Sequence, residues 1–236
     1  MLIFDLVTLI IASITMLAAC YSDVKSRSVN SYLFVPLIVV GSISSALQGA
    51  GYVPILAILG LYIFSFFSRH PFAYISGGVG VFAAATFFSL GDLYSEGYLL
   101  FVMIPYLIAF RERLFGVGDV KAIIALSLAF MAFPANLKIF SLAPAYLSLP
   151  FSFVLLFNSS FVSVAFIPYL MAINYLGGSR LGFRSLLGVE YSEGKEIRNP
   201  EKYAVVESQD RKFLVYRVPY MIPIAVGMII ALATGI

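Results

Sequence analysis

Residues 3–22, IFDLVTLIIASITMLAACYS, form an apolar run in which Asp5 is the only charged residue. A helix needs about 20 predominantly apolar residues to cross the hydrocarbon core of a membrane. The stretch has no basic n-region of the kind that begins a signal peptide, and it leads directly into a charged motif. It therefore predicts a retained first transmembrane helix.

The composition of the whole chain extends this prediction. Of its 236 residues 61% are hydrophobic and only 11% are charged, and the mean hydropathy is +0.98. A soluble domain is typically about 45–50% apolar and about 25% charged. We therefore expect an all-α polytopic integral membrane protein with about 6–8 transmembrane helices. The single cysteine, Cys20, forms neither an intrachain disulfide nor a cysteine-based zinc site.

Further apolar segments follow the first one along the chain. They cover about residues 32–49, 53–67, 72–90, 97–110, 119–135 and 218–236. The stretch 136–178 is interrupted by prolines and by Asn158, and we expect it to cross the membrane once, irregularly. That arrangement gives about eight spans, and the sequence is also compatible with about seven or about nine.

Residues 179–217 form the one water-soluble segment that the sequence indicates. They carry eight of the fifteen Lys and Arg residues and six of the twelve Asp and Glu residues. Two β-type runs, 203–206 and 213–216, flank a polar turn and predict a hairpin. A lone hairpin is marginal in water, so we expect it to pack on the membrane domain or on a partner. The predicted domains are 1–178, membrane-embedded and catalytic; 179–217, small and cytoplasmic; and 218–236, the last transmembrane helix.

The basic residues predict the orientation, because Lys and Arg in short loops remain in the cytoplasm. With the N-terminus outside, the loops 23–31, 68–71 and 111–118 and the segment 179–217 are cytoplasmic. The residues that carry this argument are Lys25, Arg27, Arg69, Arg111 and Arg113. We therefore expect a multi-pass protein of the plasma membrane whose C-terminus lies outside the cell.

Two aspartates lie at edges of predicted spans. Asp23 lies in YSDVKSRSVN, residues 21–30, and Asp119 lies in GVGDVK, residues 116–121. Ionisable groups at such positions are costly and are functional candidates. The predicted orientation places both on the cytoplasmic face, where two carboxylates can share a proton and activate a water. The pair therefore predicts an aspartic peptidase.

Structural interpretations of the same residues remain open. Asp119 is also a good N-cap for the helix it opens, and Asp23 can pair with a neighbouring basic residue. Gly116 and Gly118 predict unusual backbone dihedrals and a close approach to another segment. Lys121 either extends along the membrane interface toward water or tunes the two aspartates by its charge.

Both motifs resemble those of the prepilin peptidase family, in particular its archaeal members that process preflagellins and pilin-like precursors. That family has an aspartate after its first span, followed by basic residues and then an aliphatic and a small polar residue, as in residues 23–30. Its second aspartate lies in Gly-x-Gly-Asp, often with a nearby Lys, as in residues 116–121. Residues 218–223, VPYMIP, resemble the proline-rich start of its last helix.

The resemblance implies an intramembrane aspartic endopeptidase with Asp23 and Asp119 as its catalytic dyad and Gly116, Gly118 and Lys121 in support. Its reaction would remove the short basic leader, a class III signal peptide, from pilin- or archaellin-like precursors at the cytoplasmic face. The implied partners are membrane lipid and these precursors, with no nucleic acid. No metal and no organic cofactor are implied, and the oligomeric state is left open.

The chain also departs from the family. Three apolar segments separate residues 32–49 from the helix of Asp119, where the simplest archaeal members have room for one. The additional pair, around residues 53–110, either folds aside or alters substrate access. The zinc-binding cysteines of many bacterial members are absent, which argues against their second activity, N-methylation of the mature pilin.

Two other functions use the same carboxylates. A small proton-coupled transporter suits glycine-rich apolar segments, but the chain has no internal repeat, and both aspartates lie at a membrane edge. In a membrane assembly subunit the carboxylates are structural. A presenilin-like protease shares Gly-x-Gly-Asp, but its other aspartate lies deep inside a span, unlike Asp23.

Overall fold

The chain is mostly helical, as the composition predicts. The computed structural model describes residues 2–89, 93–109, 116–131, 135–136, 148–176, 189–190, 203–208, 211–216 and 218–235. Its α-helices are α1 (Leu2–Ser26), α2 (Val35–Leu47), α3 (Tyr52–Phe64), α4 (Pro71–Phe88), α5 (Leu93–Ala109), α6 (Val117–Ala129), α7 (Phe151–Val164), α8 (Phe166–Leu176) and α9 (Met221–Gly235). Two 3-10 helices, η1 (Ser31–Phe34) and η2 (Ser65–Phe67), precede α2 and follow α3.

Within the part of the chain that the structure describes, three helical segments are long and apolar enough to cross a membrane, as in a membrane protein. They are Asp5–Ser26, Pro71–Phe88 and Phe151–Leu176. The third joins α7 and α8, which are separated only at Ala165. Pro168 accounts for this break, because its ring nitrogen cannot donate a hydrogen bond to the carbonyl four residues earlier.

Helix α1 continues beyond the apolar run that predicted it. The run ends at Ser22, but the helix ends at Ser26, so Asp23 lies in its last turn and not behind it. Lys25 in that turn favours the extension, since a cation stabilises the negative end of the helix dipole. Arg27 then ends the helix in a left-handed conformation with φ +53°.

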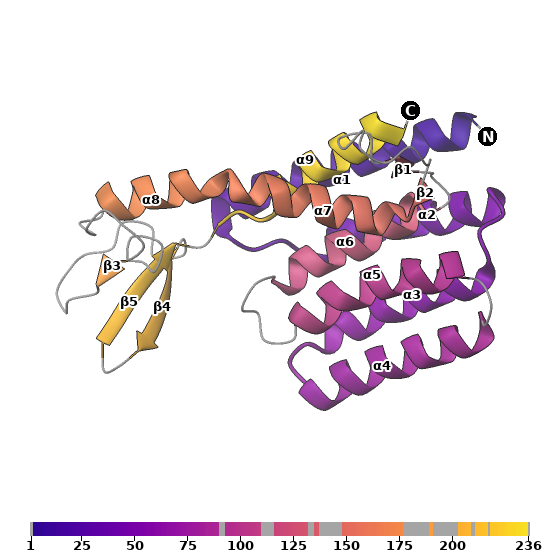
Figure 1. The fold of residues 1–236 in the computed structure, drawn as a ribbon, viewed down its shortest axis with the longest axis horizontal. Coiled ribbons are helices and arrows are strands. Elements are labelled where there is room, and N and C mark those ends of the chain that lie inside the picture. The colour runs from indigo at the N-terminus through magenta and orange to yellow at the C-terminus, as the bar shows by residue number, and fades with distance from the viewer. Residues whose placement is uncertain are drawn as a thin grey trace.

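Helix α6 is the centre of the bundle. Its residues 120–129 are all buried, and all of them except Lys121 and Ser127 are apolar. It contacts α1, α2, α3, α5, α7 and α9. Figure 1 shows α3, α4 and α5 on one side of it, with α4 outermost, and α1 and α9 on the other. The helices that cover the apolar segments around residues 53–110 therefore lie on the side of α6 away from α1 and α9.

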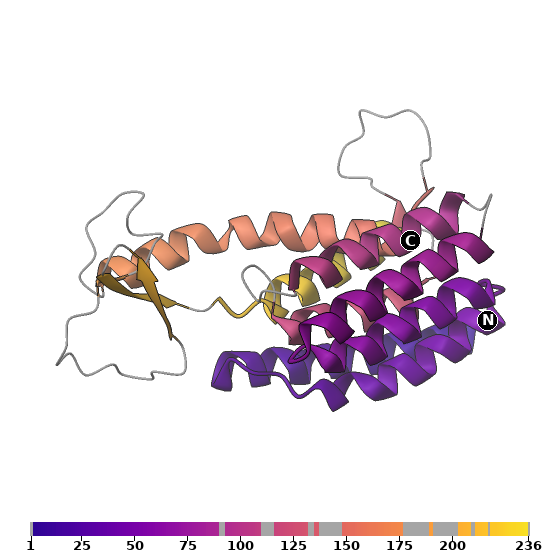
Figure 2. The same cartoon turned by 90° about the horizontal axis from the view of Figure 1, so that it is seen from below.

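A rod formed by α7 and α8 extends past the other helices, as Figure 2 shows most plainly. A small sheet lies near its far end (Figure 1). The sheet consists of β3 (Val189–Glu190), β5 (Arg211–Tyr216) and β4 (Tyr203–Ser208) in that spatial order, with both pairs antiparallel. The runs expected to form a hairpin are β4 and β5. At the opposite end of the bundle, β1 (Ala135–Asn136) pairs with β2 (Ser148–Leu149).

The sheet packs on the helical part of the chain. Tyr216, the last residue of β5, contacts Arg27 after α1 and Tyr169 of α8. We expected the hairpin to pack on the membrane domain or on a partner. In the structure it contacts the helical part of the chain. Arg111, Arg113 and most of residues 179–217 lie outside the described residues.

Candidate active site

Asp23 accepts a hydrogen bond from the start of a helix that is distant in sequence. Its side chain is buried, 8% exposed, and the backbone amide of Met221 donates to its Oδ2 at 3.1 Å. Met221 is the first residue of α9, where a backbone N–H has no partner within the helix. The positive end of the α9 dipole therefore faces the Asp23 carboxylate.

Asp119 is held at a helix start in the same way. It is the third residue of α6, and the backbone amide of Gly116 donates to its Oδ2 at 2.8 Å. The amide of Asp119 in turn donates to the carbonyl of Gly116 at 3.1 Å. These two bonds form a cap of the α6 N-terminus. The expectation that Asp119 is the N-cap residue is therefore wrong in position, because Gly116 is the N-cap and Asp119 caps the helix from its third position.

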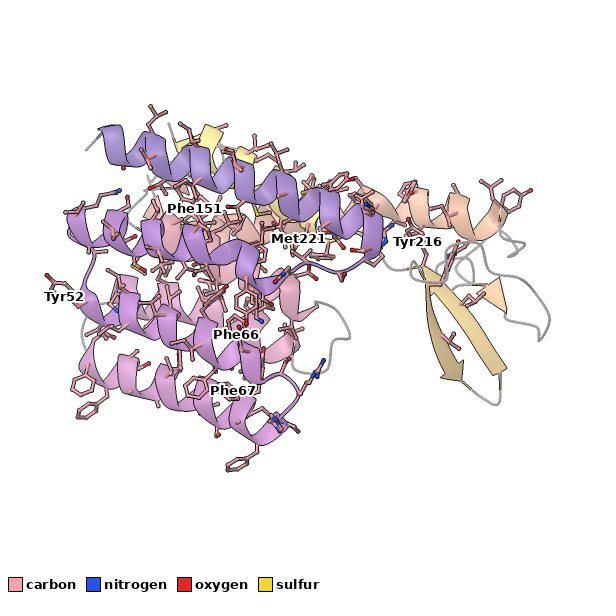
Figure 3. All side chains as sticks on the ribbon, turned by 180° about the vertical axis from the view of Figure 1, so that it is seen from behind. Tyr52, Phe66, Phe67, Phe151, Tyr216 and Met221 are labelled. Carbon is pink, nitrogen blue, oxygen red and sulfur yellow. The ribbon has the colours of Figure 1, made fainter. Side chains whose placement is uncertain are left out.

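Two observations bring the two aspartates into one region of the fold. Helix α6 contacts both α1 and α9. A methyl group added at Gly118 would lie 3.8 Å from Cε of Met221, the residue whose amide binds Asp23. Figure 3 labels Met221 below α1, where these three helices meet.

The basic residues after Asp23 do not act alike. Nη1 of Arg27 donates to the backbone carbonyl of Asp23 at 3.1 Å, so the guanidinium binds the backbone of that residue. Nζ of Lys25 lies 5.8 Å from the centre of the Tyr21 ring, one turn earlier on α1. Arg27 is therefore the basic residue of this motif that is built into the site.

The prediction for Gly116 and Gly118 is wrong in its dihedral part. Gly116 has an ordinary extended backbone, with φ −73° and ψ 158°, and Gly118 lies within α6. The glycine at position 116 instead leaves space for the Asp119 carboxylate, because an added Cβ would lie 3.3 Å from Oδ2 of Asp119. Gly118 does approach another segment, since its Cβ would lie 3.7 Å from Cβ of Val29.

Lys121 is buried inside the bundle, at 4% exposure. Its Nζ donates to Oγ of Ser31 at 2.8 Å and lies 3.7 Å from the centre of the Phe66 ring. Figure 3 labels Phe66 on the side of the bundle away from α1. The ammonium therefore joins α6 to η1 and η2 by a hydrogen bond and a cation–π contact instead of extending toward water.

Sequence reasoning missed two contributors to this site, the amide of Met221 and the side chain of Tyr216. A helix start after Pro219 is a signal for unpaired amides, and VPYMIP is such a start. Nothing in the sequence indicates which carboxylate those amides meet. The aromatic end of β5 gives no sign that it contacts Arg27.

Among the described residues, no group of three or more His, Cys, Asp and Glu side chains is placed to hold a metal ion. Comparison with protein-family models, with curated proteins and with solved structures found no match. The fold and site thus define a mostly helical protein with helices long and apolar enough to cross a membrane, and with two carboxylates that each accept a backbone amide at the start of a helix.

Proposed function

We propose that the chain is an intramembrane aspartic endopeptidase of the prepilin peptidase type, with Asp23 and Asp119 as its dyad. The observation that carries the proposal is that α1, α6 and α9 contact one another, with the Asp23 carboxylate at the start of α9 and the Asp119 carboxylate at the start of α6. In each, Oδ2 accepts a backbone amide, and the described residues offer no hydrogen bond to either Oδ1.

The proposed reaction is hydrolysis of one peptide bond with a single proton held between the two carboxylates. One carboxylate takes a proton from a water as the water oxygen bonds to the scissile carbonyl carbon. The protonated partner donates its proton to the carbonyl oxygen. The tetrahedral intermediate then breaks its C–N bond, the nitrogen receives the first proton, and the partner recovers its own. No metal or organic cofactor takes part.

The proposed topology has about eight spans, with α7 and α8 as one crossing. The order α1 to α6, α7–α8 and α9 alternates in direction along the bundle, and both termini lie at the same end (Figure 1). The opposite end carries Lys25, Arg27, Arg69 and the sheet, which favours the cytoplasm for that end. The dyad would then lie at the cytoplasmic face of the plasma membrane, where a leader of a pilin- or archaellin-like precursor is accessible.

The test is cleavage of a purified pilin-type precursor in detergent, with the products identified by mass spectrometry. We expect the wild type to cut between the basic leader and the hydrophobic helix. Asp23→Asn and Asp119→Asn should each lower the rate by about 10²- to 10⁴-fold or more, as removal of an acid–base group does. Either variant retaining substantial activity with normal folding would contradict the dyad.

Asp5→Asn is the matched control, because Asp5 lies on the same helix as Asp23 but near its other end. Its Oδ1 accepts a hydrogen bond from Nε2 of Gln48 at 2.7 Å, and an asparagine oxygen can accept the same bond. We expect full activity. If the wild type cut no precursor but took up protons with a solute in vesicles, the transporter interpretation would replace the peptidase.

A further inference from the structure

Tyr216 joins the sheet to the turn that follows α1. Nη2 of Arg27 donates a hydrogen bond to its hydroxyl. The guanidinium carbon also lies 5.0 Å from the centre of its ring, which is a cation–π arrangement. Tyr216 is 9% exposed, so this contact is largely shielded from solvent.

Arg27 transmits that contact to the backbone of Asp23. Its amide and its Nη1 donate to the same Asp23 carbonyl oxygen, at 2.9 and 3.1 Å. Its φ of +53° is costly for a residue with a side chain, and surrounding contacts must compensate for the cost. The contacts with Asp23 and Tyr216 are of that kind.

Two further rings hold Tyr216 in place. The Tyr203 ring on β4 meets it edge to face with centres 5.5 Å apart, and the Tyr169 ring on α8 does so at 6.2 Å. The position of its hydroxyl is therefore set by the sheet and by the α7–α8 rod together. Figure 3 labels Tyr216 beside the C-terminal end of α1, between the bundle and the sheet.

The same strand end leads directly to the second contact of Asp23. Five positions after Tyr216 the chain reaches Met221, whose amide binds Oδ2 of Asp23. One short segment thus contacts Asp23 twice: its carbonyl through Arg27 and its carboxylate through the start of α9.

We propose that the three-stranded sheet is a positioning element for Asp23, acting through the positioning residues Tyr216 and Arg27. When the sheet is seated, the last turn of α1 is fixed and the carboxylate faces α6. The guanidinium is then engaged inside the protein and is not a contact for a substrate leader. The catalytic consequence rests on the proposed function, but the mechanical link between sheet and turn does not.

The link is tested by hydrogen–deuterium exchange of the amides of residues 24–31 in the full chain in detergent. Tyr216→Phe removes one hydroxyl and keeps the ring and its packing. We expect the amides of this turn to exchange about tenfold faster, because a hydrogen bond to a charged donor is lost. Exchange in α3 and α4 should not change.

Tyr203→Phe is the matched control, since it removes a hydroxyl from the same cluster. The described part of the chain gives that hydroxyl no hydrogen-bond partner, so exchange should remain as in the wild type. Arg27→Gly keeps a left-handed turn without its cost but removes the side chain. We expect it to accelerate exchange at least as much as Tyr216→Phe does, because it also removes the Nη1 bond to the Asp23 carbonyl. The double variant should exchange no faster than Arg27→Gly alone.

In precursor cleavage, Tyr216→Phe and Arg27→Gly should lower kcat about tenfold with KM nearly unchanged, since a displaced carboxylate affects the chemical step. Unchanged exchange in both variants would overturn the link. A change confined to KM would overturn positioning and indicate contact with substrate. A wild type that cuts nothing would overturn the proposed function, while the exchange measurement would still decide the link.

Discussion

The amide of Met221 donates to Oδ2 of Asp23 at 3.1 Å across 198 positions of sequence. Gly116 makes the equivalent bond to Oδ2 of Asp119 at 2.8 Å, three positions away. Each carboxylate therefore faces the positive end of a helix, Asp23 that of α9 and Asp119 that of α6. The two sites differ in how they are built, because one is local and the other depends on packing of the last helix.

The local bond predicts a stability difference between two Asp119 variants. Asp119→Ala removes the acceptor of the Gly116 amide and should lower the free energy of unfolding by about 1 kcal/mol, the usual effect of losing a helix cap. Asp119→Asn keeps an acceptor oxygen and should remain within about 0.5 kcal/mol of the wild type. Denaturant unfolding in mixed micelles, followed by circular dichroism, measures both. Equal stability of the two variants would mean that the cap contributes nothing.

A second prediction concerns the close contact between α2 and α6. A Cβ at Gly41 would lie 2.7 Å from Cα and 2.9 Å from N of Ala129, both backbone atoms that cannot rotate away. Gly41→Ala should therefore destabilise the protein by about 1–3 kcal/mol, as overpacking does. The same substitution at Gly80 of α4 meets nothing within 4 Å and serves as the control. It should be neutral or stabilising by up to about 1 kcal/mol.

Features that depend on local composition were predictable from the sequence. Apolar runs indicate helices whatever their neighbours are, and the helices lie where the runs are. The shared membrane face of Asp23 and Asp119 stays a prediction from the basic residues and the order of the spans. The end of α1 was less predictable, because the apolar run ends at Ser22 while the helix continues to Ser26.

Long-range contacts were not predictable. The bonds of Asp23 with Met221 and of Arg27 with Tyr216 join residues 198 and 189 positions apart. They depend on which helix start and which strand end meet the turn after α1, and no pattern in the sequence encodes that choice. The role of Gly116 was also not predictable, although its contact is local. The lack of a side chain at this position leaves room for the Asp119 carboxylate and does not serve an unusual φ.

A third prediction concerns the contact between helices α4 and α5. The rings of Tyr74 and Tyr106 stack 4.2 Å apart, and each hydroxyl donates to the other residue's backbone carbonyl, at 2.6 and 2.9 Å. Tyr74→Phe and Tyr106→Phe should each lower the free energy of unfolding by about 1 kcal/mol. Tyr52→Phe is the control, because Tyr52 is 77% exposed and points away from the bundle (Figure 3). If Tyr52→Phe lowered the free energy of unfolding by as much, the losses at Tyr74 and Tyr106 would not be due to their hydrogen bonds.

The last prediction links helix packing to the site. A Cβ at Gly227 of α9 would contact Oγ of Ser159 and lie 2.9 Å from the Ser159 amide nitrogen and 3.2 Å from the Leu155 carbonyl oxygen, both on α7. Gly227→Ala should therefore push α9 away from α7 and move Met221 relative to Asp23. We expect a stability loss of about 1–3 kcal/mol.

Precursor cleavage by Gly227→Ala should fall about tenfold or more, mainly in kcat, because a displacement of about 1 Å at reacting groups has effects of that size or larger. Adding Ser159→Ala removes the clash with Oγ but not the one with the backbone, so it should restore only part of the rate. Gly80→Ala, which fills empty space on α4, should cleave at the wild-type rate. A Gly227→Ala variant that loses stability at full kcat would show that the start of α9 does not position Asp23.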